Sequence, residues 1–163
     1  MKEKLIPEAF NSPTYGHLEW EEALSQMVRF VGSDTKGSYE VIIGTDSEAQ
    51  NGDADFVSAV IVHKKGKGGI YFWGRQKVDN LHSLRQRIWQ EALISLSVAE
   101  KLVGDFGKIG MFGLNLEIHV DVGPNGPTRE MISEIVGMIR ANGFRVATKP
   151  ASWGASHVAD RHV

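Results

Sequence analysis

Three β-rich runs stand one after another in this chain and are followed by one long helical pattern. The runs cover residues 39–45, 56–63 and 69–78, and they contain the β-branched and aromatic side chains that favour strands. The segment KKGKG between the last two runs has the glycines and charges of a hairpin turn. This order predicts three antiparallel strands and then a helix.

The second half of the chain alternates between helical and extended patterns. Over residues 81–103, apolar side chains such as Leu84 and Ile88 recur on one helical face, and Gly104 is a plausible end. Beyond it we expect a strand over 114–122, a helix from Thr128, whose side chain can cap it, to Ala141, a strand over 144–148 and the start of a last helix over 155–162.

The N-terminal part of the sequence predicts an addition to this pattern. Residues 1–13 are expected to be a weakly ordered lead-in, residues 17–31 carry apolar side chains at helical spacing, and residues 32–38 form a polar linker. We therefore expect an N-terminal extension with an amphipathic helix, 1–38, and an α/β domain with a five-stranded mixed sheet flanked by helices, 39–163. Together they form one compact unit.

Composition narrows the chemistry that is available. A chain of 163 residues with 42% hydrophobic content can bury one sizeable core. Because it has no cysteine, disulfides, thiolate metal sites and a cysteine nucleophile are excluded. No apolar run approaches the roughly 18 residues of a membrane span, and no secretion signal opens the sequence, so we expect a cytoplasmic protein without a membrane partner. The formal charge of -2 gives no overall attraction for nucleic acid, so any such affinity must come from local patches or bound metal.

Four carboxylates stand where an element ends or where a helical face should be apolar. Asp46 follows the run VIIGT and Asp121 follows LEIHV, so both are expected at strand ends. Glu91 falls beside Ile88 on the helical wheel, at the border of the apolar face. Asp160 belongs to the last expected helix, in the segment ASHVADRHV.

Each carboxylate also has an ordinary structural explanation. Asp46 and Asp121 could hydrogen-bond their own turns. Glu91 could pair with Arg87 on the helix surface, and Asp160 could belong to a solvated tail. The same kind of placement at three successive elements nevertheless favours a shared role.

Bringing these groups together has a chemical consequence. Carboxylates within a few Å of one another repel and raise their own pKa values unless a cation neutralises them. Ligand sets made only of oxygen suit Mg²⁺ or Mn²⁺. Two such ions about 3.5–4 Å apart can activate a water and stabilise the leaving oxygen of a phosphodiester.

The order of elements and acidic residues resembles the ribonuclease H superfamily. In that superfamily the ligands are typically Asp on the first strand, Glu on the first helix after the hairpin, Asp at the fourth strand and Asp or another ligand on the final helix, which Asp46, Glu91, Asp121 and Asp160 match in order. More narrowly, GTDSE, HVDVGPNGPTREMI, NGF with TKP after it, and ASHVADRH are similar to the YkuK-like family of bacterial ribonuclease-H-like proteins, over most of residues 39–162.

The resemblance implies a nuclease that uses Mg²⁺ or Mn²⁺, as a pair of ions held by the four carboxylates. The chain lacks the basic insertion with which some ribonucleases H grip a hybrid, so hybrid specificity does not follow. The added N-terminal helix could cover an exposed sheet edge or support a dimer.

Several other residues are candidates for accessory roles. His157 and His162 flank Asp160 in the sequence and could shuttle a proton or join the metal shell, and His119 shares a strand face with Asp121. Thr128 and Arg129 open a helix and could hold an anion. Each could equally be a hydrogen-bonded histidine, a helix cap or a solvated surface residue.

Three functions are compatible with the sequence. The first is a Mg²⁺- or Mn²⁺-dependent nuclease acting on RNA, an RNA–DNA hybrid or structured DNA. The second is a non-catalytic module of the same fold that binds nucleic acid or protein, which the near-neutral charge weakly favours. The third is a metal-dependent phosphatase acting on a small phosphoester.

Overall fold

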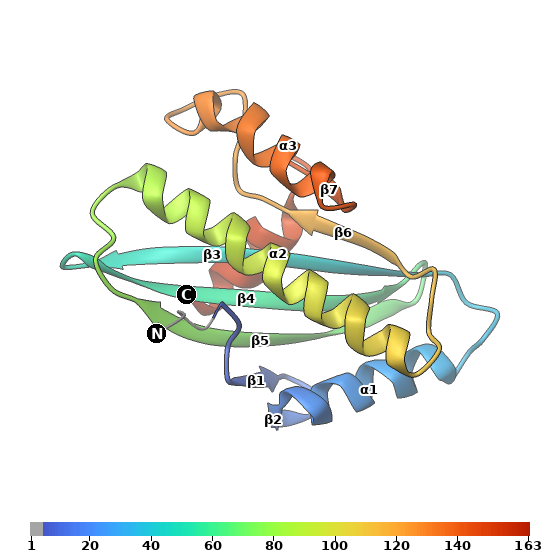
Figure 1. The fold of residues 1–163 in the computed structure, drawn as a ribbon. Helices are drawn as coiled ribbons and strands as arrows, with labels where there is room; N and C mark the ends of the chain where they lie inside the picture. Colours follow the sequence, from blue (N-terminus) through green and yellow to red (C-terminus); the bar gives the residue numbers. More distant parts are fainter. Residues whose placement is uncertain (1–4) are drawn as a thin grey trace.

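The computed structural model describes residues 5–163, apart from the side chains of residues 155 and 156. Seven strands form one sheet in the order β2-β1-β5-β4-β3-β6-β7 (Figure 1). Neighbours from β2 to β3 run antiparallel, whereas β3, β6 and β7 run parallel. The predicted α/β class with a mixed sheet is confirmed, and the strand count of five is corrected to seven.

The strands are β1 (Ala9–Ser12), β2 (Gly16–Glu19), β3 (Tyr39–Gln50), β4 (Asp53–Lys64), β5 (Gly68–Val78), β6 (Asn115–His119) and β7 (Arg145–Ala147). The helices are α1 (Trp20–Gly32), α2 (Leu84–Lys108) and α3 (Ile132–Ala141). A short 3₁₀ turn, Arg129–Met131, precedes α3. The chain closes with a π-helical turn, Gly154–Ala159, and a 3₁₀ turn, Asp160–His162, which we call the C-terminal segment.

The two additional strands come from the N-terminal part of the chain. The expectation of a weakly ordered lead-in is wrong for residues 9–12, which form β1 and pair with β2. Gly16 turns the chain at a φ of 75°, a conformation that favours glycine. Residues 17–19 are therefore held in β2, and α1 begins at Trp20 instead of the predicted residue 17, behind a capping box of Glu19 and Glu22.

The hairpin of β3 and β4 is longer than predicted. Asn51 and Gly52 form its two-residue turn with φ values of 48° and 87°, and this dipeptide is a strong sequence signal for a tight hairpin. Asp46 consequently lies inside β3, opposite Val57, and not at the end of the strand as expected.

All three helices cover one face of the sheet and enclose the main core (Figure 1). Helix α2 begins at Leu84 because the Ser83 side chain accepts a hydrogen bond from the Gln86 backbone N–H at 3.1 Å. Two expectations for this helix are wrong, since Leu84 is 38% exposed and Gly104 lies within the helix. The C-terminal segment covers the opposite face, where Ala159 packs on β4.

Among the described residues, no helix combines the length and apolar character that a membrane crossing requires.

Candidate functional site

The candidate site lies where β3 and β6 stop pairing, and we call this place the opening. The last paired residues of the two parallel strands are Gly44 and His119, while β3 continues to Gln50. Asp46 and Asp121 each lie two residues beyond that pair. In open sheets the crevice at the carboxyl ends of parallel strands is the usual place for ligands.

Glu91 approaches the opening from the helical face. It is buried, at 6% exposure, and its Oε1 accepts a hydrogen bond of 2.5 Å from Ser47 Oγ. Because side chains alternate along β3, Thr45 and Ser47 point toward α2 while Asp46 points to the other face. One turn further along α2, Ser95 Oγ donates to Thr45 Oγ1 at 2.7 Å, and both of these side chains are buried.

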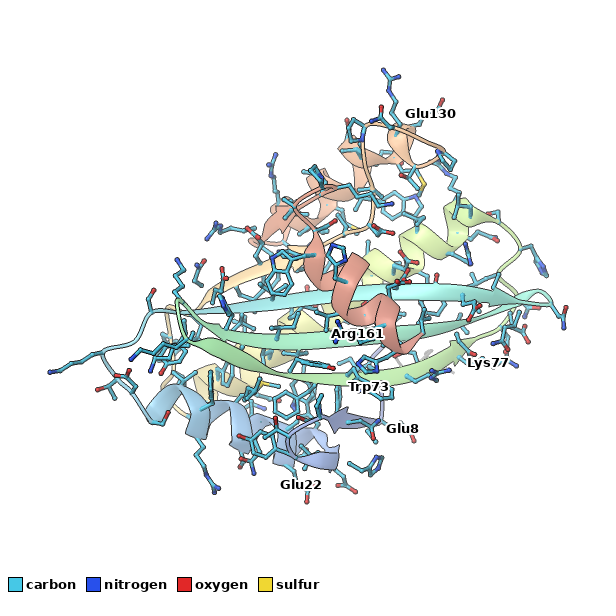
Figure 2. All side chains as sticks on the ribbon, turned by 180° about the vertical axis from the view of Figure 1, so that it is seen from behind. Glu8, Glu22, Trp73, Lys77, Glu130 and Arg161 are labelled. Carbon is cyan, nitrogen blue, oxygen red and sulfur yellow. The ribbon has the colours of Figure 1, made fainter. Side chains whose placement is uncertain are left out.

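Asp160 belongs to the C-terminal segment, which lies across the opposite face of the sheet (Figure 2). The segment is fixed at its start by the Gly154 backbone N–H, which donates to His119 Nδ1 at 3.0 Å. At its end, the His162 ring stacks on Trp73 with centroids 4.4 Å apart. Between these two anchors the Asp160 carboxyl lies close enough to Asp46 to raise the pKa of that group.

The proximity of these groups changes two pKa values. Burial, the hydrogen bond with Asp160 and the negative charges of Asp160 and Asp121 raise the pKa of Asp46 to about 7. Burial and the charges of Asp46 and Asp121 raise the pKa of Glu91 to about 8, although the Ser47 hydrogen bond and Arg87 oppose the change. Near neutral pH both groups hold a proton in a large fraction of molecules when no cation is present.

The Asp121 carboxylate has a basic neighbour. Its Oδ1 is buried and accepts no hydrogen bond of acceptable geometry, yet Lys149 Nζ lies 3.2 Å from it. The two atoms are close enough for an ion pair, but their geometry is not that of a hydrogen bond. A buried carboxylate oxygen in this condition retains its capacity to bind a cation.

The donor set fits a hard divalent cation. Asp46, Glu91, Asp121 and Asp160 offer only carboxylate oxygens, which Mg²⁺ and Mn²⁺ prefer. No three histidine or acidic side chains in the described part of the chain already stand close enough to enclose an ion. Binding of an ion by these groups would therefore require small side-chain movements, which relief of the repulsion that raises two of the pKa values would favour.

Comparison with known proteins identifies the family. A family described as "Ribonuclease H-like" matches residues 22–163 of this sequence. The chain belongs to this family. The YkuK-like resemblance is confirmed as well, because the chain is 30% identical over 167 residues to "Uncharacterized protein YkuK" of Bacillus subtilis (strain 168), across 93% of this chain and 95% of that protein.

Among solved structures, the chain is similar to RNase H1 from the halophilic archaeon Halobacterium salinarum NRC-1. The sequence identity is 13% and the TM-score is 0.37, with 75% of this chain and 96% of that chain covered.

Two of the accessory histidines in this ribonuclease H-like chain are occupied by structural contacts. His119 accepts the Gly154 N–H at Nδ1, so its Nε2 carries the proton and donates to Glu117 at 2.9 Å. Burial lowers the pKa of His119 despite that carboxylate. His162 bonds Tyr71 Oη at 2.9 Å and is directed toward β5. Both histidines therefore anchor the segment that carries Asp160.

The remaining accessory candidates lie at the surface. His157 and Arg129 are exposed. Thr128 precedes the 3₁₀ turn, but its side chain accepts a hydrogen bond from the Gly123 N–H at 3.4 Å and does not cap the turn. The expectation of a Thr128 cap is wrong because α3 begins only at Ile132.

Sequence reasoning missed Ser47, which holds Glu91 directly. Its signal was available, because a polar side chain two positions after Thr45 falls on the same inward strand face.

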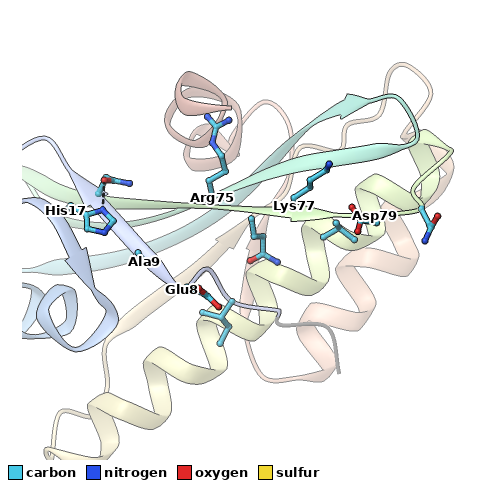
Figure 3. A pocket seen from close by; sticks show the side chains of 11 residues that line it. Glu8, Ala9, His17, Arg75, Lys77 and Asp79 are labelled. Atoms are coloured by element: carbon cyan, nitrogen blue, oxygen red, sulfur yellow. Dashed lines mark hydrogen bonds between the residues drawn. The ribbon is translucent and has the colours of Figure 1, made fainter. Parts of the chain in front are cut away.

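A groove elsewhere on the surface is separate from these carboxylates. It has a volume of about 700 Å³ and follows the second half of β5 beside β1, where Figure 3 shows Arg75, Lys77 and Asp79 spaced along it. Its lining mixes acidic and basic side chains and includes none of the four carboxylates. The four carboxylates thus remain the candidate site of this ribonuclease H-like protein.

Proposed function

We propose that this protein is a divalent-metal-dependent nuclease, in which Asp46, Glu91, Asp121 and Asp160 hold two Mg²⁺ or Mn²⁺ ions. The observation that carries the proposal is the interaction of Asp46 with all three other carboxylates, which come from a helix, a strand end and the C-terminal segment. Gathering four acidic groups at one opening is unfavourable without a cation, and this supports a metal site.

The roles of the residues follow from their positions. When bound, a pair of divalent ions supplies an activated water and charge stabilisation for the leaving oxygen of a phosphodiester. Asp46 interacts with each of the other three carboxylates and would hold the ions together with them. Ser47 orients Glu91 by donating to its Oε1. His119 and His162 position Asp160 through the C-terminal segment.

The family supports nucleic acid as the substrate class, as RNA, an RNA–DNA hybrid or structured DNA. With a formal charge of -2, the chain has no overall field to attract a polyanion. Metal ions in the carboxylate cluster would reverse the local charge at the opening. Binding of nucleic acid is therefore expected to require the metal and to weaken as salt rises.

The decisive experiment is a cleavage assay with labelled single strands, duplexes, hybrids and a phosphomonoester, at millimolar Mg²⁺ or Mn²⁺. Asp46→Asn keeps the side-chain shape but loses the charge, so cleavage should fall by orders of magnitude while the circular dichroism spectrum is unchanged. Asp79→Asn, at an exposed position beyond β5, is the matched control and should retain full activity.

Full activity of Asp46→Asn would contradict the assigned centre. A wild-type protein that cleaves no member of the panel would overturn the nuclease proposal and leave a binding module of the same fold. Cleavage of the phosphomonoester alone would indicate a phosphatase.

A further inference from the structure

Lys149 is held against the candidate site by its backbone. It lies just after β7, and its N–H donates to the Val122 carbonyl at 2.8 Å. The side-chain stem packs on Gly123 so closely that a Cβ added there would be 2.9 Å from Lys149 Cβ. The stem is therefore directed along residues 121–123, although the side chain is 49% exposed.

The ammonium group at the end of this stem faces Asp121. Its Nζ is 3.2 Å from Oδ1, the buried oxygen that accepts no well-formed hydrogen bond. The pair is held by charge and position, and not by a directed bond. A contact of this kind is easily exchanged for another cation, because a half-exposed ion pair contributes little to stability.

A metal ion on Asp121 Oδ1 and the ammonium in its present position exclude each other. Mg²⁺ and Mn²⁺ bind carboxylate oxygens at about 2.0–2.2 Å, and the ammonium covers one of the two oxygens of Asp121. Two positive charges within a few Å also repel each other. The lysine stem has four rotatable carbons, so its end can move away while the backbone bond to Val122 is kept.

We propose that Lys149 is a tethered cation that occupies the position of the metal at Asp121 and competes with the divalent ion for this carboxylate. Lys149 thereby sets the metal affinity of the site. This inference rests on the proposed function, because it takes Asp121 as a metal ligand.

The test measures metal binding directly, by calorimetric titration of Mn²⁺ into metal-stripped full-length protein at low salt. Lys149→Met retains the stem that packs on Gly123 and removes the charge. It should lower the dissociation constant for Mn²⁺ by roughly twofold to fivefold, the range expected when a half-exposed ion pair no longer has to be broken. Lys149→Arg keeps the charge and should bind Mn²⁺ within about twofold of wild type.

Lys65→Met, in the exposed turn between β4 and β5, is the matched control and should leave the dissociation constant unchanged. Circular dichroism in EDTA verifies the fold of each variant. If Lys149→Met does not fold, Lys149→Gln replaces it in the same titration. A charge-removing variant, Lys149→Met or Lys149→Gln, that binds Mn²⁺ as wild type does, or more weakly, would overturn the inference.

The outcomes separate this inference from the proposed function. Tighter Mn²⁺ binding by Lys149→Met in a protein that cleaves nothing supports the tethered cation and contradicts the nuclease. Active wild-type protein with unchanged metal affinity in Lys149→Met contradicts the tethered cation alone. Failure of both wild type and Lys149→Met to bind Mn²⁺ contradicts both.

Discussion

The burial of Glu91 has a consequence for stability that does not depend on substrate. The pKa of this group is raised from 4.5 to about 8, chiefly because burial disfavours its charged form. The folded protein therefore binds the Glu91 proton more tightly than the unfolded chain does. The resulting stabilisation is fully present below pH 4.5 and is lost as the pH rises through about 8.

The structure also gives the size of this effect. At about 1.4 kcal/mol per tenfold change in proton affinity, the difference between the two pKa values corresponds to on the order of 5 kcal/mol. Glu91→Gln is neutral at every pH and keeps an Oε1 acceptor for Ser47. In the absence of metal, the variant and wild type should be about equally stable at pH 5, and the variant should be more stable by several kcal/mol at pH 9.

Urea unfolding in EDTA at pH 5, 7 and 9 measures this difference. Glu100→Gln, at an exposed position on the same helix α2, is the control and should follow wild type at each pH. A residual slope should remain in Glu91→Gln, because Asp46 also has a raised pKa. The reasoning is refuted if the free energies of unfolding of wild type and Glu91→Gln change in parallel between pH 5 and pH 9.

Two further predictions concern metal and the C-terminal segment. Millimolar Mg²⁺ or Mn²⁺ should raise the melting temperature of wild type by about 5–10 °C if the concentration is about 100 times the dissociation constant. Asp46→Asn should lose most of this shift. An unchanged wild-type melting temperature would contradict a metal site. His119→Phe deprives the Gly154 N–H of its acceptor and should cost about 1–3 kcal/mol in urea unfolding, whereas a loss below about 0.5 kcal/mol would show that this bond does not anchor the segment.

Local patterns were sufficient for most of the secondary structure. The runs that became β3, β4 and β5 were found because strand residues alternate and β-branched side chains are concentrated in them. The end of α3 was found from Asn142 and Gly143, and Gly143 indeed adopts a φ of 88°. These features depend on neighbours a few positions away, which a single sequence displays.

The wrong predictions for β1 and Gly104 concern features that depend on residues distant in the sequence. Residues 9–12 have little pattern of their own and form β1 because β2 and β5 offer partners. Gly104 lies within α2 because the helix is buried on both sides of it, at Leu102 and Phe106, and packing outweighs the low helix propensity of one glycine. In both cases the deciding contact is distant in the sequence.

Some features of the candidate site are likewise visible in the sequence, whereas others depend on the tertiary structure. Sequence alone was sufficient to select the four acidic residues as candidates, since a carboxylate beside an apolar run is visible in the chain itself. It could not determine that β3 passes the end of β6 beside Asp46. Nor could it determine that Asp160 reaches Asp46 from the far face of the sheet.

Only the tertiary structure decided the charge state and partners of these groups. A carboxyl pKa depends on burial and on other charges within a few Å, and the charges that act on Glu91 come from residues 46 and 121. The pairing of Lys149 with Asp121 likewise exists only because β6 and β7 end side by side. The sequence therefore specified which donors the chain carries, whereas folding determined their distances, because electrostatic energy depends on separation in space and not on separation along the chain.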